Sequence, residues 1–150
     1  MHRLKPLKEH LKIGQVIPLR FKNKNEQSEL TMTVSSTDPY FHQHPNALAY
    51  AWVGTTSQDV DLVFNESYIW VLNREQGTNR YDIEIVAIHE ILHILGLRHS
   101  QLNDSVMWPS YQGLSDMSPE DVQLLQAIHG VRSNWSSRLL WLKGYFQRLI

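Results

Sequence analysis

The fold class that the sequence predicts is α+β, because strand-like segments come first along the chain and helical segments follow. The hydrophobic pattern changes to a helical one from Asp82 onward. The chain has 150 residues, of which 42% are hydrophobic, so it is long enough to bury one core. Together these observations favour a single folded domain.

The first half of the chain is predicted to be rich in strands. Residues 4–13 read as a short basic helix that ends at Gly14. Segments rich in β-branched and aromatic residues are predicted as strands at 16–21, 29–35, 47–52 and 60–65. Proline follows both Asp38 and His44, so the segment between them is predicted to be a loop, like the polar stretch 73–79.

Two helices are predicted in the second half. Asp82 is a suitable N-cap for the first helix, and Gly96 is a suitable place for it to stop. This helix is apolar on nearly every face except the one that carries two histidines, which is typical of a buried helix. The residues SPED at 118–121 predict the start of the second helix, and Gly130 its end.

Composition excludes several functional classes. The net charge of −1 provides no basic field for nucleic acid. The absence of cysteine excludes disulfides, thiolate metal ligands and a cysteine nucleophile. No apolar run reaches the roughly 18 residues of a transmembrane helix, and the basic N-terminal residues lack the apolar stretch of a signal peptide. The compartment is therefore left open.

The segment HEILHILGLRH at 89–99 contains the candidate site. In a helix, His89 and His93 lie on one face and can bind one metal ion. Gly96 can adopt a positive φ, which turns the chain and brings His99 to the same ion. Glu90 lies beside that ion, where a carboxylate can take a proton from a metal-bound water.

A histidine-rich helix without a metal is the alternative. A single helical histidine is usually a satisfied side chain, and two at this spacing recur by chance. Three histidines, a glutamate and a glycine at five defined positions favour a metal site. Three protein ligands with one open position are typical of catalytic zinc, although imidazoles also bind cobalt, nickel and copper.

These residues resemble the signature of the metzincin zinc endopeptidases, HExxHxxGxxH followed by a methionine turn. The resemblance makes Met107 the hydrophobic floor beneath the histidines. Within the metzincins the sequence is most similar to the matrixins, because Ser100 follows the third histidine. Pro109 and Tyr111 then match the segment that lines the pocket for the substrate residue just after the scissile bond. The implied fold is zincin-like, with a twisted mixed sheet, an active-site helix and a C-terminal helix.

The matrixin resemblance covers roughly residues 29–130. Residues 114–130 resemble the loop and helix that close the catalytic domain, with Asp121 matching an acid that supports the methionine turn. The segment ALAYAW resembles the edge strand that pairs with an extended substrate, and its central residues are Ala49, Tyr50 and Ala51.

Departures from the family pattern concern the second metal site and the front of the domain. Tyr50 and Val63 hold the places of histidines that bind a structural zinc in many matrixins, so we expect that zinc and the neighbouring calcium ions to be absent. His42 and His44 are the candidates for a substitute pair, although loop histidines beside a proline are usually unliganded. The sequence has no cysteine for a cysteine switch. The N-terminal strand and helix look shortened, which suggests that another chain supplies sheet material.

The domain predicted from this resemblance is residues 1–130, and residues 131–150 form a C-terminal amphipathic helical extension. An apolar stripe in the extension consists of Trp135, Leu139, Leu142, Phe146 and Leu149. It has three possible partners: its own domain, a neighbouring subunit or a membrane surface.

Two functions compete at this point. The first is a zinc-dependent endopeptidase that hydrolyses peptide bonds of a peptide or protein substrate through a zinc-activated water, with Glu90 as general base and one catalytic zinc. The second is a zinc-binding structural or assembly module of a larger particle with weak or no protease activity. The resemblance is compatible with an extracellular or particle-associated protein.

Overall fold

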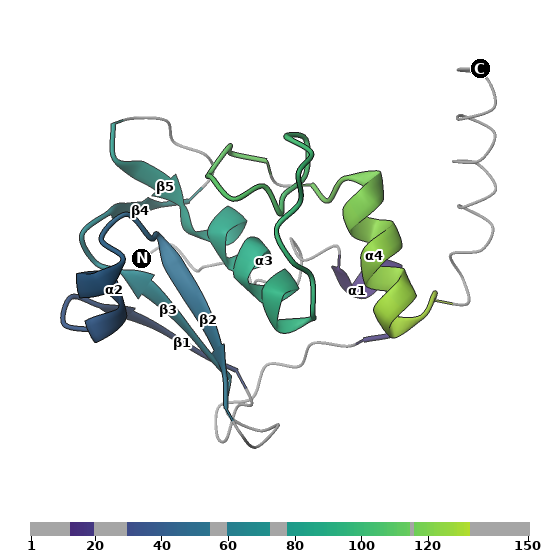
Figure 1. The fold of residues 1–150 in the computed structure, drawn as a ribbon, viewed down its shortest axis with the longest axis horizontal. Helices are drawn as coiled ribbons and strands as arrows, with labels where there is room; N and C mark the ends of the chain where they lie inside the picture. The colour runs from purple at the N-terminus through teal and green to yellow at the C-terminus, as the bar shows by residue number, and fades with distance from the viewer. Residues whose placement is uncertain (1–12, 20–29, 55–59, 73–77, 115, 133–150) are drawn as a thin grey trace.

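The computed structural model of the chain describes residues 13–19, 30–54, 60–72, 78–114 and 116–132 (Figure 1). Their elements are α1 (Ile13–Val16), β1 (Leu30–Ser35), α2 (Pro39–Gln43), β2 (Ala49–Val53), β3 (Val60–Asn65), β4 (Ile69–Val71), β5 (Arg80–Asp82), α3 (Ile83–Ile94) and α4 (Pro119–His129). The strands and α2 gather at one end of the molecule, α1 and α4 lie at the other, and α3 lies between them.

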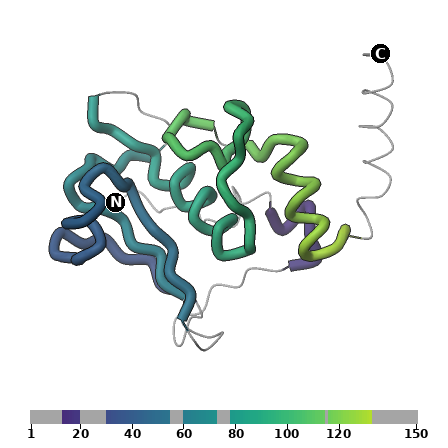
Figure 2. Tube along the Cα trace, viewed as in Figure 1, coloured from purple at the N-terminus to yellow at the C-terminus, as the bar shows by residue number. Residues whose placement is uncertain are grey.

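The main sheet is mixed and has the strand order β1-β3-β2. β1 pairs with β3 in parallel, and β2 pairs with β3 in antiparallel. β2 is therefore an edge strand, and it runs beside α3 (Figure 2). Strands β4 and β5 form a separate parallel pair. Because β5 ends at Asp82, directly before α3, this pair determines where the helix begins.

The hydrophobic core lies between the sheet, α3 and α4. Leu62 on β3, Leu92 on α3 and Leu125 on α4 are fully buried. The remaining buried members of this core are Ile13, Val16, Ile17, Phe64, Val86, Ala87, Ile88, Ile91, Leu97, Val106 and Met107. Within the described residues, no helix is both long enough and apolar enough to cross a membrane.

The predicted strand at 16–21 is wrong over its described residues. Val16 ends helix α1, and residues 17–19 are not in a strand. Gly14 does not end a helix, because it lies inside α1. The reason is the spacing of Ile13, Val16 and Ile17, which places all three on one helical face, and all three are buried. Gln126 Nε2 on α4 donates to the Val16 carbonyl at 3.1 Å and holds α1 in place.

The predicted loop between Asp38 and Pro45 is also wrong, because it contains helix α2. The Asp38 side chain accepts from Tyr40 N–H at 2.9 Å, and Pro39 occupies the first helical position. Aspartate followed by proline is a helix start as well as a turn signal. Phe41 is buried, so tertiary packing favours the short helix.

Most other predicted elements are confirmed. The strands predicted at 29–35, 47–52 and 60–65 correspond to β1, β2 and β3, each within two residues at either end. Helix α4 has Ser118 as N-cap with a reciprocal capping box to Asp121, and Gly130 ends it with φ 81°. Strands β4 and β5 were not predicted. Most of the predicted helix at 4–13, most of the loop at 73–79 and most of the extension at 131–150 lie outside the described residues.

Candidate metal centre and substrate cleft

Helix α3 carries the first two histidines of the candidate site. Its N-cap Asp82 accepts hydrogen bonds from two backbone N–H groups of the first turn, at 2.9 and 3.4 Å. His89 and His93 lie one turn apart on the face of α3 that is turned away from the core. The helix stops just before Gly96, whose φ of 97° reverses the chain and brings back His99.

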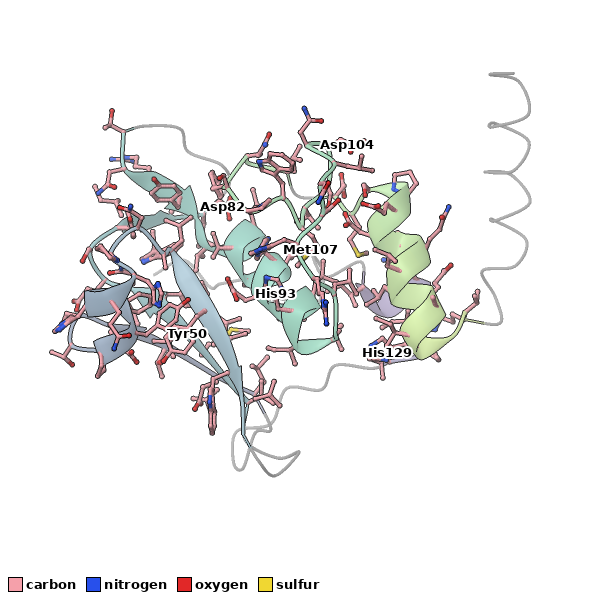
Figure 3. All side chains as sticks on the ribbon, in the orientation of Figure 1. Tyr50, Asp82, His93, Asp104, Met107 and His129 are labelled. Atoms are coloured by element: carbon pink, nitrogen blue, oxygen red, sulfur yellow. The ribbon has the colours of Figure 1, made fainter. Side chains whose placement is uncertain are left out.

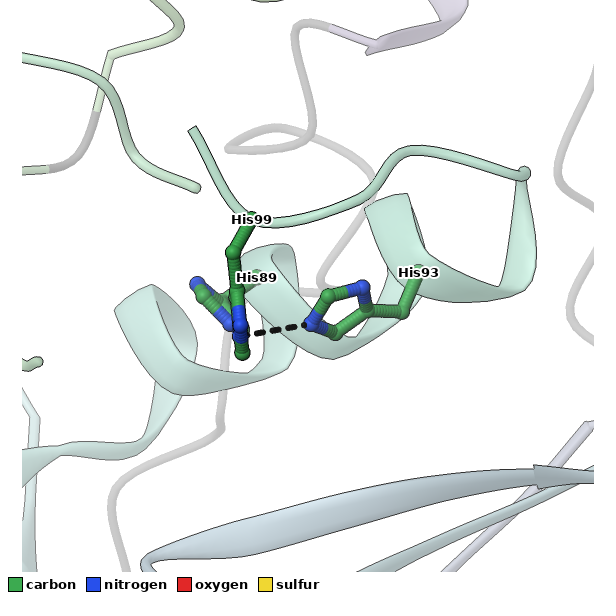
Figure 4. A group of neighbouring side chains, drawn as sticks. All are labelled: His89, His93 and His99. Atoms are coloured by element: carbon green, nitrogen blue, oxygen red, sulfur yellow. Dashed lines mark hydrogen bonds between the residues drawn. The ribbon is translucent and has the colours of Figure 1, made fainter. Parts of the chain in front are cut away.

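The three histidines converge as their spacing predicts. One ring nitrogen from each of His89, His93 and His99 lies within 4.8 Å of the other two. Figure 4 shows the three rings turned toward one another, with 3.2 Å between Nε2 of His93 and Nε2 of His99. His99 is exposed, and the other two are partly buried, so the group opens to solvent on one side.

Hydrogen bonds determine which ring nitrogens face the centre of the group. His89 Nδ1 donates to the Val106 carbonyl at 2.7 Å, and His93 Nδ1 donates to the Leu97 carbonyl at 2.8 Å. Since each Nδ1 must carry a proton to donate, each neutral ring presents an unprotonated Nε2. Imidazole nitrogens are good zinc ligands, so three of them that converge form a donor set that fits a metal such as zinc.

Burial favours the neutral form of two of the imidazoles, His89 and His99. Desolvation lowers the pKa of His89 to about 4, and nearby His93 and His99 lower it further, against the opposing effect of the hydrogen bond to Val106. Desolvation also lowers the pKa of His99, with a smaller contribution from His93. Neutral imidazole is the form that binds metal, so the site is prepared for metal near neutral pH.

Glu90 lies next to the histidines and is nearly buried, with an exposed fraction of 8%. Desolvation raises the pKa of this carboxyl to about 7, although a hydrogen bond with the backbone of Ala51 on β2 acts in the opposite direction. A carboxyl with a pKa close to neutrality can both accept and return a proton under physiological conditions.

Met107 lies in a turn that follows the third histidine along the chain, and it is 1% exposed. Asp121 on α4 holds this turn: it accepts from Ser105 Oγ at 2.6 Å and from Val106 N–H at 3.2 Å. Since the Val106 carbonyl in turn holds the ring of His89, the carboxylate on α4 is connected to a histidine of the site.

A cleft of about 630 Å³ runs past the histidines. It is lined on one side by β2 and α2 and on the other by α3 and the segment after Met107. Of the predicted site residues, the cleft brings together Ala49, Tyr50, Ala51, His89, Glu90, His93, His99, Pro109 and Tyr111. Met107 and Gly96 do not line it: Met107 is a buried member of the hydrophobic core, and Gly96 lies in the turn between α3 and His99.

The edge strand β2 lines this cleft and turns part of its backbone outward. Leu48 O accepts from Asn65 N–H, and pairing continues with Tyr50 opposite Val63. Backbone groups alternate in direction along an antiparallel strand, so those of Ala49 and Ala51 point away from β3. The hydrogen bond between Ala51 and Glu90 agrees with this direction.

The matrixin family model matches residues 9–130 of this sequence. The chain belongs to the matrixin family. It is 34% identical to macrophage metalloelastase of Rattus norvegicus over 127 residues, which are 78% of this chain and 26% of the rat protein. It is 40% identical to matrilysin of Felis catus over 91 residues, covering 57% of this chain and 33% of that protein. The chain thus spans about a third or less of the length of these relatives.

The α+β architecture described above is therefore that of a metzincin catalytic domain, as the sequence predicts. Human matrilysin is 30% identical over 131 residues, which cover 81% of this chain and 48% of that protein. The matched region includes the helix with the first two histidines, the glycine turn and the third histidine.

Tyr50 lies on the α2 side of the sheet in this matrixin, whereas His93 lies on the α3 side (Figure 3). Its hydroxyl donates to Asp38 Oδ2 at 2.8 Å, and its ring packs on Tyr40 with centroids 4.4 Å apart. Desolvation and this hydrogen bond raise the pKa of Tyr50 to about 12. Among the described residues, His42 and His44 belong to no group of three or more potential metal ligands.

Several contributors to the site were not predicted. The carbonyls of Val106 and Leu97 have no sequence signal, because any residue supplies a carbonyl. Tyr81 packs edge-to-face on Tyr111 with centroids 5.2 Å apart, and the Tyr111 hydroxyl accepts from Asp82 N–H at 3.2 Å. The unpredicted strand β5 thereby connects the cleft wall to the start of α3.

Proposed function

We propose that residues 1–130 form a zinc-dependent endopeptidase domain and that residues 131–150 are an extension of it. The observation that carries this proposal is the convergence of three imidazoles beside a buried carboxylate, in a cleft bordered by an open strand edge. A metal centre, a proton acceptor and a place for an extended chain are the parts that peptide hydrolysis requires.

His89, His93 and His99 would hold one zinc ion through three imidazole nitrogens. When bound, zinc supplies a Lewis acid that polarises a carbonyl and lowers the pKa of water. The carbonyls of Val106 and Leu97 keep two of the rings in the orientation that binding needs. Prior orientation of the ligands reduces the entropy that is lost when the ion binds.

Glu90 would act as the general base. Its carboxylate takes a proton from the attacking water and returns it to the leaving amine, so no other acid is needed in the cycle. Burial leaves the carboxylate poorly hydrated and therefore a stronger proton acceptor.

The substrate would lie extended along β2. The outward backbone groups of Ala49 and the carbonyl of Ala51 would pair with its main chain, as in β-strand addition, while the Ala51 N–H donates to Glu90. Tyr50 lies between them with its side chain engaged by Asp38, so it contributes through its position in the strand. Pro109 and Tyr111 would line the pocket for the substrate residue that follows the scissile bond.

We further propose that the domain uses one catalytic zinc and lacks the structural zinc and calcium ions of many matrixins. In the resemblance to the family pattern, Tyr50 and the buried Val63 take the places of those zinc ligands, and neither side chain suits zinc. The Tyr50–Asp38 hydrogen bond and the packing of Tyr40 would connect α2 to the sheet without a metal.

The assembly-module alternative is less well supported. It predicts a fourth protein ligand on zinc, a blocked cleft, or a chain that is ordered only with its partner. In the described parts of the chain, the histidine group has three members and lines the open cleft. A structural zinc site also has no need of a carboxylate beside it.

The test is cleavage of an unstructured protein by the full chain, analysed by mass spectrometry. We expect cleavage that a chelator abolishes and added zinc restores. Glu90→Ala should remove it while zinc binding persists. If a broad substrate panel gave no metal-dependent cleavage above the level of Glu90→Ala, the endopeptidase proposal would fail.

A further inference from the structure

The three histidines are not held in the same way. His89 and His93 each donate from Nδ1 to a backbone carbonyl, at 2.7 and 2.8 Å. Among the described residues, His99 makes no such bond, and it is also the exposed member of the group. Its position must therefore depend on how its backbone is held.

The residue directly after His99 is a centre of hydrogen bonding. Ser100 N–H donates to the Met107 carbonyl at 2.9 Å, which ties the segment to the methionine turn. Ser100 Oγ accepts from Leu102 N–H at 3.0 Å. The same oxygen donates to Glu120 Oε2 at 2.5 Å, in a pair that is partly buried.

Glu120 lies in the first turn of α4, next to Asp121. A distance of 2.5 Å is typical of a hydroxyl that donates to a charged carboxylate, which is one of the stronger hydrogen bonds in proteins. The first turn of α4 thus holds two segments of the site, because Asp121 holds the methionine turn and Glu120 holds the segment that begins at His99.

We propose that Ser100 and Glu120 are a pair of positioning residues that hold His99 in place for the metal. The inference rests on the proposed zinc site, and neither residue is assigned contact with metal or substrate. Without the pair, the exposed segment after Gly96 would sample more conformations, and binding zinc would require ordering it. Zinc affinity should therefore fall even though all three imidazoles remain.

Zinc affinity of the full-length chain is the readout, measured by competition with a chromophoric chelator. We expect Ser100→Ala and Glu120→Ala each to weaken zinc binding by roughly 3- to 10-fold, at or below the low end of the 10- to 100-fold effect of residues that orient metal ligands. The double variant should bind zinc within twofold of the weaker single variant. Ser100→Thr and Glu120→Gln, which keep the hydroxyl and an acceptor oxygen, should recover most of the affinity.

Glu66→Ala is the matched control, because Glu66 is exposed and lies beyond the end of β3, away from the cleft. Wild-type zinc affinity in both single variants would overturn the proposal, as would a double variant whose loss equals the product of the two single losses. Cleavage is not the readout. A wild-type chain that binds zinc but cleaves nothing would therefore contradict the proposed function alone.

Discussion

Replacing Asp121 by asparagine should destabilise the protein more than any exposed substitution, although the two side chains have nearly the same shape. The carboxylate is fully buried and accepts three hydrogen bonds, from Ser105 Oγ at 2.6 Å, Val106 N–H at 3.2 Å and Ser118 N–H at 2.8 Å. All three groups donate to the carboxylate. An asparagine amide has one oxygen and one NH₂ group, so its oxygen can accept from both backbone N–H groups only if the NH₂ faces Ser105 Oγ, whose hydroxyl must then turn and accept instead of donating.

The magnitude follows from the loss of charge. A hydrogen bond to a charged group contributes about 1.5–3 kcal/mol and a neutral one about 0.5–1.5 kcal/mol, so three weakened bonds cost about 3 kcal/mol. For a chain of this length, 1 kcal/mol changes the melting temperature by about 2–4 °C, which predicts a decrease of about 6–12 °C. His89 should also be affected, because its acceptor is the carbonyl of Val106.

The assay is urea unfolding of the metal-free chain at pH 7, followed by tryptophan fluorescence. Asp104→Asn is the matched control, because Asp104 is an exposed aspartate close to the same turn, and it should unfold like wild type. A free energy of unfolding for Asp121→Asn within about 0.5 kcal/mol of wild type would refute the reasoning, since surface substitutions have effects of that size.

Four further outcomes are expected. Because burial raises the pKa of Glu90 to about 7, its ionisation opposes folding as pH rises from about 4.5 to 7. In the metal-free state, the free energy of unfolding of Glu90→Gln should therefore exceed that of wild type by up to about 3 kcal/mol at pH 8. At pH 4.5 the two proteins should differ little. In that variant, chemical unfolding should also show stability falling as pH decreases from about 6.5 to 4, because the lowered pKa of His89 resists protonation in the folded state. Gly96→Ala should lower the free energy of unfolding by about 1–2 kcal/mol, because an alanine is strained at the positive φ of 97°. An unchanged melting temperature would contradict this backbone strain. Tyr50→Phe should lower the free energy of unfolding by about 0.5–1.5 kcal/mol, because the hydrogen bond to Asp38 is lost. An unchanged free energy of unfolding would show that the position of α2 does not depend on this bond.

The core of the candidate site could be predicted from the sequence because helix geometry is local. The four-residue spacing of His89 and His93 places them on one face, and Gly96 provides a turn that few other residues allow. The N-caps Asp82 and Ser118 could be predicted for the same reason, because capping depends on neighbouring residues, and both are present in the structure.

Other features could not be predicted, because they depend on contacts between distant segments. Ile13, Val16 and Ile17 fit a strand or a helix equally well by composition, and packing against α4 decides for the helix. Short strands such as β4 have little periodic signal. The Ser100–Glu120 bond joins residues twenty apart, and spacing alone does not indicate which serine meets which carboxylate.

The most direct test of the central claim is the rate of peptide cleavage by Glu90→Gln compared with wild type at equal zinc content. Glutamine keeps the size of the side chain but cannot accept the proton. If Glu90 is the general base, kcat/KM should fall by about 100- to 10,000-fold while zinc content is unchanged. Equal kcat/KM values for the two proteins, with equal zinc content, would contradict the account.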